Sequence, residues 1–296
     1  MSGAIHRRIP TYPQARVIVD NDFAGDPDGL LALAHHLLAD GAVVRGITST
    51  AIPRAGEPMP EGDTARDAVI ELLDRLGVAE RPVVSADTTA RFADLVEPTD
   101  GACVLLEEAA RYDDLPLFVC AGGPLTNVAS ALRADPTLAE RMTVVWIGGG
   151  SHPEGAWEYN LMHDLPAAQY VFNHTRVPIM QVPQAVYRQC AMSTAELEHG
   201  LRSTGEFGRW LYSRFTSPPS FVRIAGHWPM GDSPPVLITA LTTESSTSRK
   251  IPSPWIDDEG GYATNPAARD LVVFDTIDVR LLFADFFARL HLAAAV

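Results

Sequence analysis

The chain of 296 residues has an ordinary hydrophobic content of 46%, which suits one globular α/β domain. Its 23 basic and 37 acidic residues give a net charge of −14, which repels polyphosphate backbones and anionic membranes, so we expect neither nucleic acid nor membrane as a partner. The three cysteines have no C-x-x-C spacing, and no segment has the length and apolarity of a membrane span or a secretion signal. These features predict a cytoplasmic location.

The first half of the chain alternates short β-branched runs with amphipathic segments. Residues 15–20 predict a buried strand ending at Asp20, and residues 26–40 predict a helix with Asp26 as N-cap and Pro27 at its first position. The same reasoning predicts strands at 42–50, 81–86, 115–123, 142–150 and 177–183, and helices at 61–78, 101–112 and 124–136. This alternation predicts an α/β fold, with an open, mostly parallel sheet and helices on both faces.

The second half is less regular. From about residue 193 to 250 the pattern becomes helical and then irregular, and the Ser/Thr/Pro-rich stretch 242–254 predicts an exposed loop. A strand at 270–278 and a helix at 279–292 follow. We therefore expect a single domain over residues 1–296, with a flexible N-terminus over 1–14 and a helical and irregular excursion in the C-terminal half.

Four aspartates follow the first strand within nine positions: Asp20, Asp22, Asp26 and Asp28. In open parallel sheets, ligands bind where loops leave the carboxyl ends of the strands. Each aspartate alone is explained equally well as a helix cap or a solvated turn residue. Together they are harder to explain in that way, because like charges this close require a cation or a proton between them. An all-carboxylate site favours Ca²⁺, and Mg²⁺ less so.

Three further stretches carry polar residues at strand ends. In "CAGGPLTN" (120–127) two glycines follow a strand, which permits either close approach of a ligand or tight packing. In "WIGGGSHPEGAWEYNLMHD" (146–164) Glu158 and Asn160 alternate with aromatic residues, as would suit a ligand with hydroxyl groups and a flat ring. In "GHWPMGDSPPVLITAL" (226–241) Asp232 precedes an apolar helical run, where it is either a site residue or an N-cap.

These stretches, in this order, resemble the inosine-uridine-preferring nucleoside hydrolase family over roughly residues 16–290. The acidic D-x-D-P-G-x-D-D motif of that family corresponds to "DNDFAGDPDGLLAL", and its G-P-L-T-N motif is unchanged at residues 123–127. Its E-F-N-x-x-x-D-P-x-A-A motif corresponds to "EYNLMHDLPAA", and its H-D-P-x-A segment to "GDSPPV". The chain is therefore similar to a divergent member of this family, with a nucleoside hydrolase-like fold.

The resemblance implies Ca²⁺-dependent hydrolysis of the N-glycosidic bond of a nucleoside-like compound to sugar and free base, by a homodimer or homotetramer. It implies that Asp22 is a metal ligand and also the base that activates the attacking water, with Asp20 supporting the site from behind. The implied metal ligands are Asp22, Asp26, the Thr126 carbonyl and Asp232. The implied contacts to the sugar hydroxyls are Asp28, Glu158 and Asn160.

The acidic motif departs from the family pattern. Aligning Asp28 with the first acid of the family's acidic pair leaves Gly29 on the second, so that one metal ligand is missing. Either Asp26 takes the vacant position, or Asp26 and Asp28 form the pair with Pro27 between them. A second departure is "STAIPRAG" (49–56), which replaces a V-x-G-N segment and puts one sugar contact in doubt.

The third departure concerns the leaving base. Gly231 stands where purine-cleaving members have the histidine that protonates the base, and loss of such an acid costs about 10²–10⁴-fold in rate. His227 and His163 are the candidate substitutes. A catalytically weak protein that binds a ribosyl ligand is thus an alternative, but the retention of Asp22 and Asp232 favours the hydrolase.

Overall fold

An eight-stranded sheet forms the centre of the molecule, in the order β3-β2-β1-β4-β5-β6-β12-β9. The structure is a computed structural model that describes residues 9–53, 62–218 and 223–295. All neighbouring strands run parallel except β12 and β9. The strands are β1 (Ala15–Asn21), β2 (Ala42–Thr50), β3 (Val83–Thr88), β4 (Leu117–Ala121), β5 (Thr143–Ile147), β6 (Ile179–Val182), β9 (Thr247–Pro252) and β12 (Asp270–Thr276).

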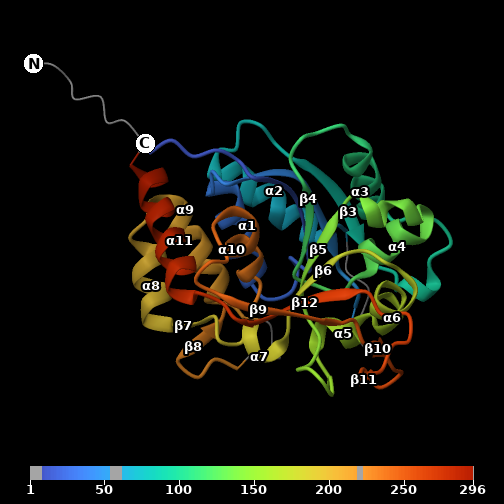
Figure 1. Cartoon of the computed structure of the whole chain (residues 1–296). Helices are drawn as coiled ribbons and strands as arrows, with labels where there is room; N and C mark the ends of the chain where they lie inside the picture. The colour runs from blue at the N-terminus through green and yellow to red at the C-terminus, as the bar shows by residue number, and fades with distance from the viewer. Residues whose placement is uncertain (1–8, 54–61, 219–222, 296) are drawn as a thin grey trace, which may run out of the picture.

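Helices cover both faces of this sheet, as Figure 1 shows. Side chains alternate along β1, so Val17 and Val19 pack into one hydrophobic cluster and Ile18 into the other. The first cluster includes residues of α1 (Asp28–Leu38), α2 (Thr64–Leu76), α8 (Thr194–Arg202), α9 (Gly205–Phe215), α10 (Pro234–Ala240) and α11 (Val279–Ala294). The second includes residues of α3 (Asp100–Ala110), α4 (Thr126–Ala134) and α6 (Leu165–His174). The predicted α/β fold is confirmed.

Short elements fill the connections between these layers. They are the 3₁₀ turns η1 (Phe92–Asp94) and η2 (Pro136–Glu140), the helices α5 (Tyr159–His163) and α7 (Gln184–Tyr187), and the two-stranded sheets β7 (Ala191–Ser193) with β8 (His227–Pro229) and β10 (Trp255–Ile256) with β11 (Tyr262–Ala263). The helical and irregular excursion expected from about residue 193 to 250 contains α8, α9, β8 and α10.

Two local predictions are wrong. Helix α1 begins at Asp28 with Pro27 at the N-cap position and no side-chain cap, so Asp26 does not cap it. The expected loop at 242–254 contains β9, which pairs antiparallel with β12. This strand lies at the edge of the sheet and is almost entirely exposed, so its polar residues carry no apolar alternation that would predict a strand.

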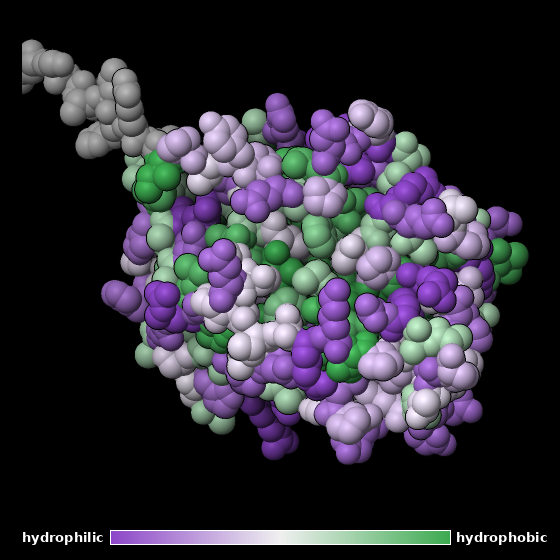
Figure 2. Space-filling view, in the orientation of Figure 1, coloured by the Kyte–Doolittle hydropathy of each residue, from purple (hydrophilic) through white to green (hydrophobic). Residues whose placement is uncertain are grey.

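The surface around the front of the sheet is mixed in character. Figure 2 shows hydrophilic residues toward the edges of this face and hydrophobic residues interspersed near its centre. Within the described ranges, no helix has the length and apolarity needed to cross a bilayer. Two stretches named above lie outside the described residues: positions Arg54–Gly56 of "STAIPRAG", and residues 1–8 of the expected flexible N-terminus.

Candidate active site

The topology of the sheet places a crevice beside the end of β1. The chain runs from β1 outward through β2 to β3 and then returns, so that β4 lies on the other side of β1. The loops after β1 and β4 therefore leave the sheet in opposite directions, which makes this the switch point where open α/β sheets bind their ligands. A pocket of about 170 Å³ lies there.

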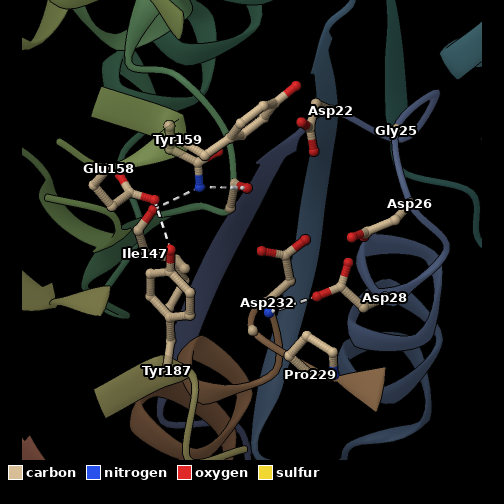
Figure 3. A pocket seen from close by; sticks show the side chains of 13 residues that line it. Asp22, Gly25, Asp26, Asp28, Ile147, Glu158, Tyr159, Tyr187, Pro229 and Asp232 are labelled. Carbon is tan, nitrogen blue, oxygen red and sulfur yellow. Dashed lines mark hydrogen bonds between the residues drawn. The ribbon is translucent and has the colours of Figure 1, made fainter. Parts of the chain in front are cut away.

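Acidic residues from four separate segments line this pocket (Figure 3). Asp22 follows β1, Asp26 and Asp28 lie at the start of α1, Glu158 precedes α5, and Asp232 precedes α10. The other described lining residues are Gly25, Gly122, Ile147, Tyr159, Asn160, Tyr187, Pro229 and Gly231. Because no Lys or Arg is among these lining residues, the protein itself supplies little compensation for the negative charge.

Asn21, the last residue of β1, joins two of these segments. Its Nδ2 donates to Oδ2 of Asp232 at 3.0 Å, and its Oδ1 accepts the backbone N–H of Asp22 at 2.7 Å. Gly122 allows this arrangement, because a Cβ there would lie 2.4 Å from Nδ2 of Asn21 and 2.9 Å from Cγ of Asp232. A side chain at Gly29 would likewise point at Asn21, so the vacant acid position of the sequence motif is packed against this residue.

Asp28 and Asp232 form a buried pair of acids. Oδ2 of Asp28 accepts the backbone N–H of Asp232 at 3.2 Å. Burial, together with repulsion from Asp232, Asp26 and Asp22, raises the pKa of Asp28 well above its usual range. Burial and the nearby charge of Asp26 raise the pKa of Asp232 in the same way, opposed by the hydrogen bond from Asn21. The pair therefore holds protons more readily than isolated aspartates do.

Asp20 does not line the pocket but lies buried within β1. Its Oδ1 accepts hydrogen bonds from the Thr48 hydroxyl and from Nδ2 of Asn127, both at 2.8 Å. Its Oδ2 is buried and has no hydrogen-bond partner among the residues that the structure describes. Burial raises the pKa of Asp20 to about 6, although the two hydrogen bonds oppose the rise. Its supporting role stays a prediction.

Glu158 and Asn160 form the opposite side of the pocket. Glu158 is fully buried, and its Oε2 accepts the backbone N–H groups of Gly149 and Leu161 at 2.8 and 2.9 Å. Its Oε1 accepts the hydroxyl of Tyr187 at 2.7 Å. Asn160 donates from Nδ2 to the carbonyls of Gly122 and Ile147. Both amide protons of Asn160 are thus occupied, so Oδ1 is the atom left to accept a ligand hydroxyl.

Three further predicted site residues, besides Asp20, do not line the pocket. Thr126 is buried at the start of α4, and its hydroxyl donates to Asp164. His163 bonds the carbonyl of Ile52 through Nε2, and His227 is exposed on β8. The structure therefore does not bring either candidate leaving-group acid to the pocket. The part of Thr126 in a metal shell stays a prediction.

Sequence reasoning missed Asn21 and Tyr187. Asn21 occupies the variable position of the D-x-D motif, where no residue type is expected. Tyr187 lies 29 residues after Glu158, and the two meet only because β5 and β6 are neighbours in the sheet. The order of strands, rather than any local spacing, brings Tyr187 to the site.

The donor set fits a hard divalent cation in its chemistry. It consists of carboxylates, two of which have raised pKa values that a cation would lower again. Within the described part of the chain, however, no three His, Cys, Asp or Glu side chains form a group that could hold a metal ion. The acids line one pocket without converging on a single point.

The architecture and this acidic pocket define an α/β protein with a polar crevice at the switch point of its sheet. The family model described as inosine-uridine preferring nucleoside hydrolase matches residues 17–248. The chain belongs to this family, as the order of its motifs predicts.

Among curated proteins, pyrimidine-specific ribonucleoside hydrolase RihA of Enterobacter sp. (strain 638) is 28% identical over 197 residues, covering 58% of this chain and 61% of the relative. The RihA protein of Salmonella typhimurium is 28% identical over 207 residues, covering 62% and 64%. The chain thus spans under two thirds of the length of these relatives.

Solved structures support the fold. The plant nucleoside hydrolase PpNRh1 superposes with a TM-score of 0.71 at 20% identity, covering 94% of this chain and 99% of that one. An inosine-uridine preferring nucleoside hydrolase from Bacillus anthracis superposes with a TM-score of 0.67 at 18% identity, covering 95% and 100%.

Proposed function

We propose that this chain hydrolyses the N-glycosidic bond of ribonucleosides or nucleoside-like compounds, giving the sugar and the free base. The observation that carries the proposal is the acidic pocket at the switch point, which gathers Asp22, Asp26, Asp28 and Asp232 in a member of this family. A neutral nucleoside is compatible with a pocket this acidic, whereas a nucleotide would be repelled by it.

Asp22, Asp26 and Asp232 would hold a divalent cation, with the Thr126 carbonyl as a further predicted ligand. Ca²⁺ suits a set of carboxylate and carbonyl oxygens better than Mg²⁺, because the Ca²⁺ shell is flexible in number and geometry whereas Mg²⁺ requires a nearly ideal octahedron. When bound, the cation supplies a lowered pKa for the attacking water and charge compensation for the acids.

The residues of the chain then have distinct tasks. Asp22 accepts a proton from the attacking water, whose oxygen bonds to the anomeric carbon as the C–N bond breaks. Asp28, Glu158 and Asn160 hold the sugar hydroxyls and stabilise positive charge developing on the ring. The departing base takes up one proton, and the positions of His163 and His227 do not favour either as its donor.

The test is sugar release from a panel of purine, pyrimidine and modified ribonucleosides, with Ca²⁺ and with chelator. The curated RihA relatives are named as pyrimidine-specific, so uridine and cytidine enter the panel first. Asp22→Asn should abolish release, while Asp67→Asn, an exposed aspartate on α2, should leave it unchanged. Wild-type turnover by Asp22→Asn would refute the proposed base.

A ribosyl-binding protein is the second candidate, favoured because no histidine is among the described lining residues of the pocket. Absence of sugar release across the panel, with calorimetry still detecting binding of Ca²⁺ or ribose, would select the ribosyl-binding protein.

We further propose a single domain and a cytoplasmic homodimer or homotetramer. The three free cysteines are compatible with a reducing compartment, and light scattering would test the assembly.

A further inference from the structure

Gly231 and Tyr187 face each other across one wall of the pocket. A Cβ built on Gly231 would lie 3.1 Å from Cδ2 and 3.6 Å from Cε2 of Tyr187, and 3.7 Å from Oδ2 of Asp28. Gly231 is not among the glycines with positive φ, so its backbone conformation does not require glycine. The absence of a side chain there therefore serves the close approach of the tyrosine ring rather than a turn.

The hydroxyl of Tyr187 in turn occupies one acceptor site of the Glu158 carboxylate. Among the described residues, three donors reach the Glu158 carboxylate: two backbone N–H groups on Oε2 and the Tyr187 hydroxyl on Oε1. A carboxylate has about four lone-pair sites, so one site on Oε1 is left for a ligand. Burial and the neighbouring Glu158 raise the pKa of Tyr187 above its usual range, so the phenol stays protonated and remains a donor.

We propose that Tyr187 is a positioning residue for the pentose, and that Gly231, which has no side chain, leaves the room that the Tyr187 ring needs. The tyrosine ring packs so close to Gly231 that a side chain at position 231 would press against it, and its hydroxyl fixes Glu158 so that Oε1 presents one acceptor to a sugar hydroxyl. A sugar-binding contact is thus built from three segments: the approach to α5, the end of α7 and the turn before α10. This inference rests on the proposed function and specifies how its site holds the sugar.

The test compares ribose binding and nucleoside hydrolysis in the full chain and in matched variants. Tyr187→Phe keeps the ring and removes only the bond to Glu158, so it should weaken ribose binding by roughly 10-fold and raise KM by more than it lowers kcat. The control is Tyr262→Phe, which removes the hydroxyl of another half-buried tyrosine, hydrogen-bonded to Gln181 and outside the pocket. The control should leave ribose affinity unchanged.

A double-mutant cycle tests the pairing. Gly231→Ala should displace the ring by a few tenths of an ångström and weaken ribose binding, but most of this loss should vanish when Tyr187 is already Phe. Thermal melting confirms that each variant is folded. Unchanged ribose affinity and KM in Tyr187→Phe, or fully additive effects in the cycle, would overturn the inference while wild-type hydrolysis upholds the proposed function. Wild-type protein that neither releases nor binds ribose would overturn both.

Discussion

Replacing Asp20 with Asn should change how the stability of the protein depends on pH. Asp20 is buried, has one oxygen with no hydrogen-bond partner in the described part of the chain, and has a pKa of about 6 against a usual value of 3.8. Each pKa unit corresponds to about 1.36 kcal/mol, so ionising Asp20 in the folded chain costs about 3 kcal/mol. Because the folded pKa is the higher one, protonated Asp20 contributes about 3 kcal/mol to the free energy of unfolding. This contribution is fully present below about pH 4 and is lost as the pH rises through about 6.

Asn cannot ionise, but its side-chain oxygen can still accept the hydrogen bonds from Thr48 and Asn127. The free energy of unfolding of Asp20→Asn, measured against wild type, should therefore rise by about 3 kcal/mol between about pH 4 and about pH 7.5. Other acids titrate in both proteins, so their contributions cancel in this difference.

Urea unfolding followed by circular dichroism, in the presence of chelator, measures the difference at each pH. Asp67→Asn is the control, because Asp67 is exposed and should show no pH-dependent difference from wild type. A difference between Asp20→Asn and wild type that stays constant across the range would refute the raised pKa and with it the cost assigned to burial.

Three further outcomes test the site. Ca²⁺ binding should release protons, because the cation displaces those held by Asp28 and Asp232, whose pKa values are raised. Calorimetry in buffers of different ionisation enthalpy would reveal this release, and its absence would place the cation away from the pair. Asp26→Ala should weaken Ca²⁺ affinity in the same assay, and unchanged affinity would remove Asp26 from the shell. His227→Ala should leave sugar release unchanged because this side chain is exposed outside the pocket, whereas a loss of about 10²-fold or more would show that it reaches the substrate.

Most of the central sheet follows from the sequence, because its strands are short, buried and β-branched. The predicted strand at 42–50 matches β2 to the residue, and the buried run at 15–20 matches β1 to within one residue. Strand β9 could not be predicted in this way: its residues are mostly polar and exposed, and its pairing with β12 depends on the position of a strand that begins only at Asp270.

The acids of the site were predictable because they lie beside strand ends in recognisable motifs, whereas the contacts between them were not. Asn21 and Asp232 are 211 positions apart, and Asp28 and Asp232 are 204 positions apart. Only the packing of α10 against α1 and β1 brings them together. Local spacing gives the chemical identity of such residues, but their hydrogen-bond partners depend on the tertiary fold.

The acids of the pocket lower the free energy of unfolding, and the reason is their burial close to one another. Asp28 accepts one backbone N–H, and Asp232 accepts one amide N–H from Asn21, which is less compensation than two buried charges require. An Asn at either position would keep a similar shape without the charge, so stability alone does not account for the acids. A positively charged occupant would relieve the repulsion, and so would the positive charge that develops on a sugar ring as its C–N bond breaks. The cost of folding the acids together is therefore recovered only when the pocket is occupied, which is the behaviour expected of a site that stabilises a cationic transition state.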